Sequence, residues 1–227
     1  MKPLALITGA SRGIGAAIAY ELAKSHRLLL VSRNEIDLAL LSSKITDIGG
    51  DAKFAAVDLA DETKLLDWLA SVTEVPEVLI LNAGVGSFKP SEEYDLDDYN
   101  TMFNLNTRAT FLLSKHFLPK GTKSIVSIIS DAALRFFPNG SLYSASKAAQ
   151  HAYLKSLRTE WQTKGVRVCN IYPGLTNSWF NGQNPANEQH SYKMKTDEIA
   201  RAVRYVLDAP ANVVIDEITL HPIQQKY

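Results

Sequence analysis

Apolar and polar positions along the 227-residue chain form two alternating patterns. Short, continuously apolar runs are typical of strands that are buried on both faces of a sheet. Between them, apolar residues recur every three or four positions, as they do on one face of a helix. The runs predict strands at 4–7, 27–31, 52–57, 78–81, 124–129, 166–171 and 213–220, and the longer stretches predict helices that end near 24, 48, 118, 164 and 207, with a further helix from about 61.

This alternation repeats strand and helix six times and closes with a final strand, without an internal linker. Strands that are connected through helices at this spacing pair in parallel, and the helices cover both faces of the sheet. The sequence therefore predicts one α/β domain over residues 1–227 with a doubly wound, mostly parallel, seven-stranded sheet. One long irregular stretch with Trp179 and Phe180 predicts a partly apolar substrate lid at about 175–195.

Composition narrows the functional classes. Lys plus Arg and Asp plus Glu balance at 24 each, so no net field attracts nucleic acid or an anionic membrane. The single cysteine, Cys169, excludes a disulfide framework and a cysteine-based metal cluster, and its apolar surroundings favour a buried thiol. No apolar run approaches the ~20 residues of a membrane span. We expect a cytoplasmic protein that binds neither nucleic acid nor membrane.

A glycine-rich turn joins the first strand to the first helix. Residues 8–15 read TGASRGIG, with glycines at 9, 13 and 15. Glycines let the backbone approach a pyrophosphate, and the helix N-terminus supplies free N–H groups and a favourable dipole. An ordinary tight turn is the alternative, but three glycines between a buried strand and a helix favour a dinucleotide site.

The end of the second strand bears on the choice of nucleotide. A carboxylate at this place in a dinucleotide fold selects the free 2′-hydroxyl of NAD. Here the strand ends at Ser32, without an acid, and arginines stand at 33 and, inside the glycine turn, at 12. Arginine presents a fork of donors that suits phosphate. Arg12 and Arg33 together indicate NADP, although either one alone also fits a solvated surface charge.

Polar or small residues follow the other strands at Asp58, Asn82-Ala83-Gly84, Ser130 and Pro173-Gly174. Ligands of parallel sheets bind at the carboxyl ends of the strands, so we expect these residues to meet at one edge. Asp58 is suited to accept a hydrogen bond from an adenine amino group. It is equally suited to cap the helix that starts near Asp61, and the local sequence leaves both open.

Tyr143 and Lys147 are one helical turn apart and therefore share a helix face. An ammonium beside a phenol lowers the phenol pKa from about 10, which equips it for acid–base chemistry near neutral pH. Such a pair also occurs by chance on solvated helices. Asn106 lies mid-helix among apolar residues, where it either holds a water in a site or faces solvent.

In this order and spacing, the glycine turn, Asp58, Asn82-Ala83-Gly84, Asn106, Ser130, Tyr143-x3-Lys147 and Pro173-Gly174 resemble the motif set of the short-chain dehydrogenase/reductases over nearly the whole chain. The resemblance implies a Rossmann-type fold and an active-site tetrad at Asn106, Ser130, Tyr143 and Lys147. It implies an NADP(H) site made of Gly9, Ser11, Arg12, Gly13, Ile14, Gly15, Ser32, Arg33, Asp58, Leu59, Asn82, Ala83, Gly84, Tyr143, Lys147, Pro173, Gly174, Thr176 and Ser178.

Some positions depart from the usual pattern of that family. Leu81 and Ile129 replace a frequent asparagine and a frequent serine, and Ser178 stands where a threonine often contacts the nicotinamide amide. The segment 213–222 is more similar to the sepiapterin reductase-like and 3-hydroxy acid dehydrogenase-like branches. Because members of the family dimerise through helices that resemble 95–118 and 141–164, we expect a homodimer or homotetramer.

The resemblance implies hydride transfer between NADPH and a small ketone, aldehyde or secondary alcohol. Tyr143 would protonate the oxygen, Ser130 would polarise the carbonyl, and Lys147 would depress the tyrosine pKa. Asn106 would hold a water that relays protons to Lys147. A 3-oxoacyl thioester or a 3-hydroxy acid is an alternative substrate. An inactive dinucleotide-binding regulator and a nucleotide-sugar epimerase or dehydratase are rival functions.

Overall fold

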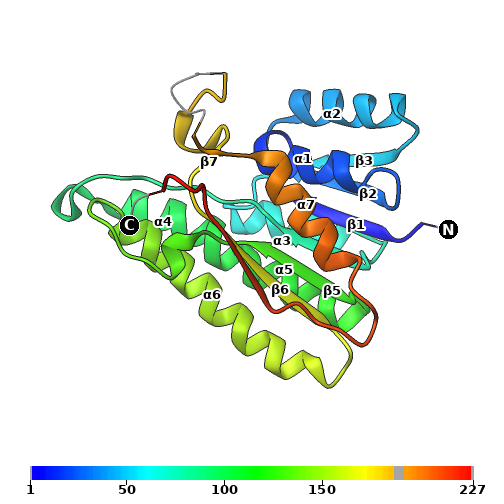
Figure 1. Ribbon diagram of the computed structural model, residues 1–227. Coiled ribbons are helices and arrows are strands. Elements are labelled where there is room, and N and C mark those ends of the chain that lie inside the picture. The colour runs from blue at the N-terminus through cyan, green and yellow to red at the C-terminus, as the bar shows by residue number, and fades with distance from the viewer. Residues whose placement is uncertain (1, 187–191, 226–227) are drawn as a thin grey trace.

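The computed structural model describes residues 2–186 and 192–225 and is built on a seven-stranded, wholly parallel sheet (Figure 1). The strand order is β3-β2-β1-β4-β5-β6-β9, so the chain reverses its direction of growth between β1 and β4. This order confirms the predicted doubly wound sheet. The strands are β1 (Leu4–Thr8), β2 (Arg27–Ser32), β3 (Asp51–Ala56), β4 (Val78–Leu81), β5 (Ser124–Ile128), β6 (Arg167–Pro173) and β9 (Glu217–Leu220).

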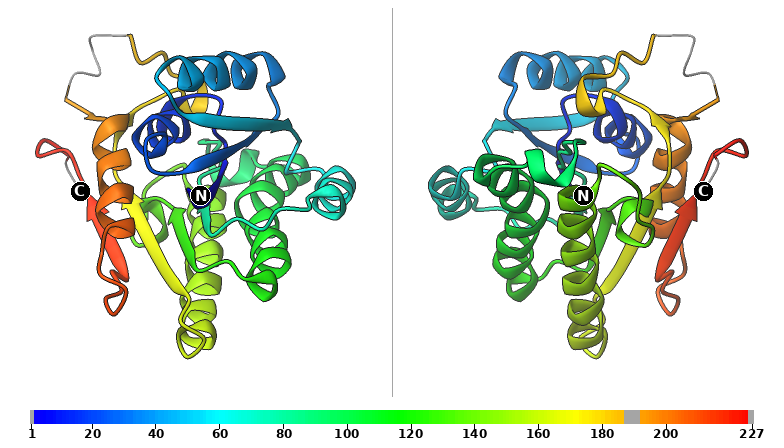
Figure 2. Two further views of the ribbon diagram at one scale, coloured as in Figure 1. Left: turned by 90° about the vertical axis from the view of Figure 1, so that its right-hand side faces the viewer. Right: turned by 90° about the vertical axis from the view of Figure 1, so that its left-hand side faces the viewer.

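Helices cover both faces of this sheet and bury its apolar runs (Figure 2). Because successive strand residues point to opposite faces, Ile7 packs into one core cluster and Leu6 into the other. The first cluster is covered by α1 (Gly13–Leu22), α2 (Glu35–Asp47) and α7 (Thr196–Leu207), and the second by α3 (Glu62–Ser71), α5 (Ala109–Phe117) and α6 (Ser141–Gln162).

Two predicted elements differ in the structure. The helix expected over 95–118 consists of α4 (Leu96–Phe103), a π-helical turn (Asn104–Arg108) and α5. A π turn inserts an extra residue into a helix, which periodicity over so few residues does not reveal. The strand expected over 213–220 is paired only over β9, since Val213 is instead in a turn closed by its N–H to Pro210 O at 2.8 Å.

The predicted lid has a structured base. β7 (Thr176–Asn177) pairs in parallel with β8 (Met194–Lys195), and a 3₁₀ turn (Phe180–Gly182) lies between them. Residues 187–191 of the predicted lid lie outside the described residues. The two strands bring both ends of the lid together beside the carboxyl end of β6.

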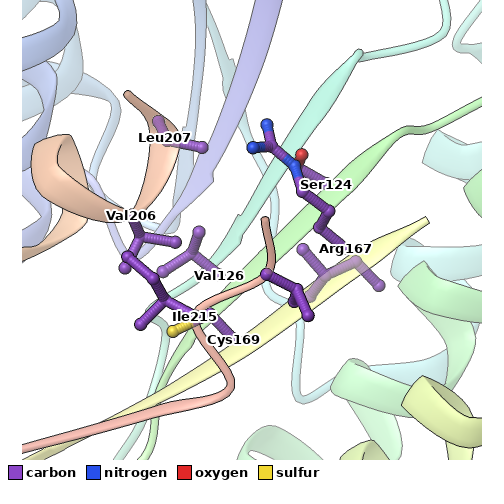
Figure 3. Close-up of a pocket in the computed structure, with 9 residues that line it drawn as sticks. Ser124, Val126, Arg167, Cys169, Val206, Leu207 and Ile215 are labelled. Atoms are coloured by element: carbon purple, nitrogen blue, oxygen red, sulfur yellow. The ribbon is translucent and has the colours of Figure 1, made fainter. Parts of the chain in front are cut away.

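A small cavity lies near the amino ends of β5 and β6, opposite the carboxyl edge of the sheet (Figure 3). It is about 10 Å³, which is room for a single water molecule at most. Its lining includes the first residues of β5 and β6, the end of α7 and Cys169, whose thiol has its pKa raised to about 12 by burial. The thiol is therefore inert, as the sequence predicts. In the described part of the chain, none of the helices has the length and apolar character needed to cross a membrane.

Thr8, the last residue of β1, connects β1 to β4 at the carboxyl edge of the sheet. Its buried hydroxyl donates to Ile80 O at 3.2 Å and accepts the N–H groups of Asn82 and Ala83, each at 3.0 Å. One side chain therefore satisfies three backbone groups at the carboxyl ends of β1 and β4.

Replacing Thr8 with valine keeps the shape of the side chain and leaves those backbone groups unpaired. We expect the free energy of unfolding to fall by about 1–3 kcal/mol, measured by urea denaturation. Thr46→Val is the matched control, because the exposed Thr46 hydroxyl bonds only Ser42 O of its own helix. Equal midpoints for the two variants would contradict this assignment.

Candidate active site

The glycine turn after β1 is shaped by two close approaches. Gly9 has a φ of +64°, and a Cβ at this position would lie 2.9 Å from Ala83 Cα. A Cβ at Gly15 would collide with Gly9 O. Asn82 holds the turn from β4 by donating to Thr8 O at 2.9 Å and to Gly9 O at 3.1 Å. Its predicted cofactor-binding role therefore includes a structural part.

The N-terminus of α1 has the properties of an anion site. The helix begins at Gly13, and Arg12 at its N-cap position makes no side-chain cap. The first N–H groups of the helix thus lack the usual side-chain acceptor, and the helix dipole favours an anion there. Ser11, Arg12 and Ile14 lie at this end of the helix, and their contact with a pyrophosphate stays a prediction.

The two arginines predicted to select NADP are both exposed at the same side of the sheet. The Arg12 guanidinium lies 5.7 Å from the ring centroid of Trp179, so this residue of the predicted lid lies against the glycine turn. Ser32 is nearly buried at the end of β2, and its hydroxyl accepts Asn34 N–H at 3.3 Å. Arg33 lies between them in sequence, next to the cap of α2.

The structure separates the two interpretations of Asp58. The helix cap is Asp61, whose carboxylate accepts Lys64 N–H at 3.1 Å. Asp58 instead accepts Ala60 N–H at 3.0 Å and remains partly exposed after β3, with Leu59 buried beside it. Asp58 therefore does not cap α3.

Ser130 and Tyr143 are brought together by β5 and the first turn of α6. Their side chains share a hydrogen bond, and the Ser130 hydroxyl also accepts Ala132 N–H at 3.1 Å. Tyr143 is only 6% exposed. Burial raises the pKa of its phenol to about 12, and the bond to Ser130 opposes this only in part. The phenol is therefore protonated at neutral pH.

Lys147 is also buried, with 2% of its surface exposed. Burial lowers the pKa of its ammonium to about 7. Its Nζ donates to Gln150 Oε1 at 3.1 Å and lies close to Gly84. The predicted lowering of the Tyr143 pKa by Lys147 is thus not present in this arrangement, because burial of the phenol dominates and Lys147 is bonded to Gln150.

Gln150 is a residue that the sequence interpretation missed. It is fully buried, and its Nε2 donates to Thr110 Oγ1 at 3.0 Å and to Ser127 Oγ at 3.3 Å. These bonds fix the amide so that its oxygen points at Lys147. The available signal was a polar residue three positions after Lys147 on the face of α6 that turns toward β5.

Asn106 is fully buried in the π turn. Its Oδ1 accepts Val85 N–H and its Nδ2 donates to Val85 O and to Ser146 Oγ, each at 2.9 Å. The amide therefore holds the segment after β4 against α6. The solvent-facing alternative is wrong, and the predicted water relay stays a prediction.

The remaining predicted cofactor residues, Pro173, Gly174, Thr176 and Ser178, lie at the end of β6 and in the segment that follows it. Thr176 Oγ1 donates to Gly174 O at 3.0 Å, and buried Ser178 accepts Phe180 N–H at 3.3 Å. Gln225, which the sequence interpretation did not single out, accepts Leu175 N–H at 2.8 Å. It also donates to Asp131 Oδ2 at 2.7 Å, so the C-terminal segment contacts the residue after Ser130.

Comparison with known proteins decides the family. The sequence model of the short chain dehydrogenases matches residues 3–189. The chain belongs to the short-chain dehydrogenase family. This confirms the predicted family and, with it, an NAD(P)-dependent oxidoreductase.

Individual members of the short-chain dehydrogenase family are similar over most of the chain. A hydroxynaphthalene reductase-like protein of Metarhizium acridum is 34% identical over 75% of this chain and 67% of its own. An alcohol dehydrogenase from Thermococcus sibiricus, solved with 5-hydroxy-NADP, has a TM-score of 0.93 and 28% identity over 100% of this chain and 99% of its own. A 3-oxoacyl (acyl-carrier-protein) reductase of Agrobacterium tumefaciens with NADP bound has a TM-score of 0.86 and 25% identity over 96% and 92%.

The contact between Lys147 and Gln150 generates a pH prediction. Carbonyl reduction that uses the Lys147 ammonium should decline as the pH rises through about 7, since the ammonium is lost above its pKa. Gln150→Leu removes an acceptor that favours the charged form, so the Lys147 pKa falls and the decline moves to lower pH. Gln150→Glu places a carboxylate there and moves the decline to higher pH.

The measurement is the pH profile of kcat/KM in the reducing direction, with thermal unfolding as a check on folding. If the pH of the decline moves in opposite directions in the two variants, Gln150 acts on the charge of Lys147 and not only through packing. Identical pH profiles in wild type and both variants would refute the role of Gln150 at Lys147.

Proposed function

We propose that this short-chain dehydrogenase is an NADPH-dependent carbonyl reductase that acts reversibly on a small ketone or aldehyde and the corresponding secondary or primary alcohol. The observation that carries the proposal is the Ser130–Tyr143 pair at the carboxyl edge of the sheet. The half-buried Ser130 hydroxyl and the buried Tyr143 phenol, which stays protonated at neutral pH, are bonded to each other there. This arrangement suits donation of a proton to a carbonyl oxygen.

The roles follow from the state of each group. Tyr143 gives its proton to the oxygen of the substrate, and Ser130 donates a hydrogen bond that stabilises negative charge on the same oxygen. Lys147 supplies a positive charge close to Gly84 at the end of β4, and Asn106 keeps that segment in place. NADPH supplies the hydride when it is bound.

The choice of NADP rests on this chain's own charges. No carboxylate stands at Ser32, and Arg12 and Arg33 are both exposed where the 2′-phosphate of an adenosine would come in this fold. The similar alcohol dehydrogenase and 3-oxoacyl reductase were solved with 5-hydroxy-NADP and NADP, which supports the same preference here.

A second candidate is a reductase of 3-oxoacyl thioesters or a 3-hydroxy acid dehydrogenase. It is favoured by the similar 3-oxoacyl (acyl-carrier-protein) reductase. Both reactions use the same proton donor, so only the substrate separates them. The sepiapterin reductase-like branch likewise stays a prediction.

We also propose that residues 175–195 act as a lid on a single domain and that the chain forms a homodimer or homotetramer. The contacts of Trp179 with Arg12 and of Phe180 with Tyr143 support a lid that covers nucleotide and substrate together. Tyr99 on α4 and Phe111 on α5 are 44% and 41% exposed, which supports a helical interface.

Tyr143→Phe removes the proton donor and leaves the ring. We expect kcat for NADPH-dependent carbonyl reduction to fall by about 10²- to 10⁴-fold, with NADPH binding unchanged by fluorescence titration. Tyr153→Phe on the same helix is the control and should retain activity. Wild-type turnover in Tyr143→Phe would sink the assignment of the donor.

Arg33→Asp replaces a phosphate-binding charge with a group that repels phosphate and attracts a ribose hydroxyl. The ratio of kcat/KM for NADPH over NADH should fall by about 10- to 100-fold, because hydrogen bonds to charged groups are strong. Arg201→Asp, on the exposed side of α7, should leave the ratio unchanged. If Arg33→Asp keeps the wild-type ratio, Arg33 is not the selector.

A further inference from the structure

Three aromatic rings from three separate loops form one cluster with the phenol of Tyr143, two in contact with it and the third packed on one of those two. They are Phe88 after β4, Phe137 after β5 and Phe180 in the lid, and we call them the aromatic chamber. We propose that the aromatic chamber selects uncharged carbonyl compounds that carry a planar ring beside the carbonyl group. This inference rests on the proposed carbonyl reductase function and names its substrate class.

The geometry of the rings defines the chamber. The centroid of Phe88 lies 5.3 Å from that of Tyr143, 5.9 Å from Phe137 and 6.4 Å from Phe180. Phe180 in turn lies 5.6 Å from Tyr143. These are tilted and edge-to-face contacts, the arrangements in which aromatic rings attract one another. A ring of a ligand would therefore enter a set of faces and edges that already suits it.

The chamber is built into the backbone. A Cβ at Gly86 would lie 2.8 Å from the Phe180 ring, and a Cβ at Gly140 would collide with the ring of Phe137. Both glycines are buried, so each ring lies directly against main chain. The two rings reach these positions only because their neighbours lack side chains.

Tyr94 fixes the two loops that carry Phe88 and Phe137 relative to each other. Its hydroxyl contacts Ser87 O at 2.8 Å and Asn139 O at 2.9 Å. The N–H of Lys89 donates to Asn139 O at 3.0 Å. The chamber is thus preorganised, which reduces the entropy lost when a ligand binds.

The rings remain accessible to a ligand. Phe88 is 38% exposed although it lies beside the buried Tyr143, and Phe137, packed on Phe88, is 42% exposed. Two large apolar side chains left open next to a proton donor are a surface that a ring of a substrate would cover. Phe136, the residue before Phe137 in the same loop, is 82% exposed and serves as a control position.

The charges around the chamber favour an uncharged ligand. Lys89 follows Phe88, and its ammonium is held by Asp98 at 2.5 Å. Asp131, which follows Ser130, adds negative charge near the phenol, and its carboxylate is bonded to Gln225 and lies 3.3 Å from His221 Nε2. A carboxylate beside the carbonyl would be desolvated among the rings, which disfavours it.

The test compares kcat/KM for matched carbonyl pairs with NADPH. Acetophenone and 2-octanone have the same number of carbons and differ in the ring, while methyl benzoylformate and benzoylformate differ in charge. We expect the ring-bearing ketone and the neutral ester each to be preferred by about tenfold or more. Phe88→Leu should remove most of the ring preference, measured as the ratio of kcat/KM for acetophenone over 2-octanone, and Phe136→Leu should leave that ratio intact.

Preference for 2-octanone or for benzoylformate, or an unchanged ring preference in Phe88→Leu, would overturn the inference. Thermal shift of the NADP-loaded protein by acetophenone against 2-octanone gives a second readout that needs no turnover. Ring-selective stabilisation without any reduction would count against the proposed function and for the chamber. Turnover of both ketones without ring selectivity would count against the chamber and for the proposed function.

Discussion

Burial of a single ammonium constrains the centre of this molecule. A lysine inside a protein needs an acceptor or loses its proton, and Lys147 has Gln150 as its hydrogen-bond acceptor. Gln150 in turn is held by Thr110 from α5 and Ser127 from β5. The carboxyl end of β5, helix α5 and helix α6 are thereby joined through one amide.

The same edge is also held by hydrogen bonds between side chains and backbone groups around the glycine turn and the end of β4. Thr8 and Asn82 tie the glycine turn to the end of β4, and Asn106 ties the next segment to α6. Positions where hydride and proton would be delivered are thus fixed by amide and hydroxyl groups that need not contact a ligand. These groups explain why the family motifs are spread over almost the whole chain.

The sequence was sufficient for the order of strands and helices, because parallel strands buried on both faces are continuously apolar. It was also sufficient to predict that Ser130, Tyr143, Lys147 and the glycine turn lie at one edge of the sheet. The short edge strand β9, the π turn and the environment of Lys147 were not predictable. Each depends on which neighbour supplies a hydrogen bond, and periodicity along one chain does not carry that information. The direction of the Tyr143 pKa was wrong for the same reason, since burial of the phenol depends on packing.

Gln225 gives the base of the predicted lid and the loop after Ser130 a common anchor. It bonds Leu175 at the base of the lid and Asp131 beside Ser130, two segments that leave different strands. One amide therefore restrains both segments, and a displacement of either segment would strain or break a bond of that amide.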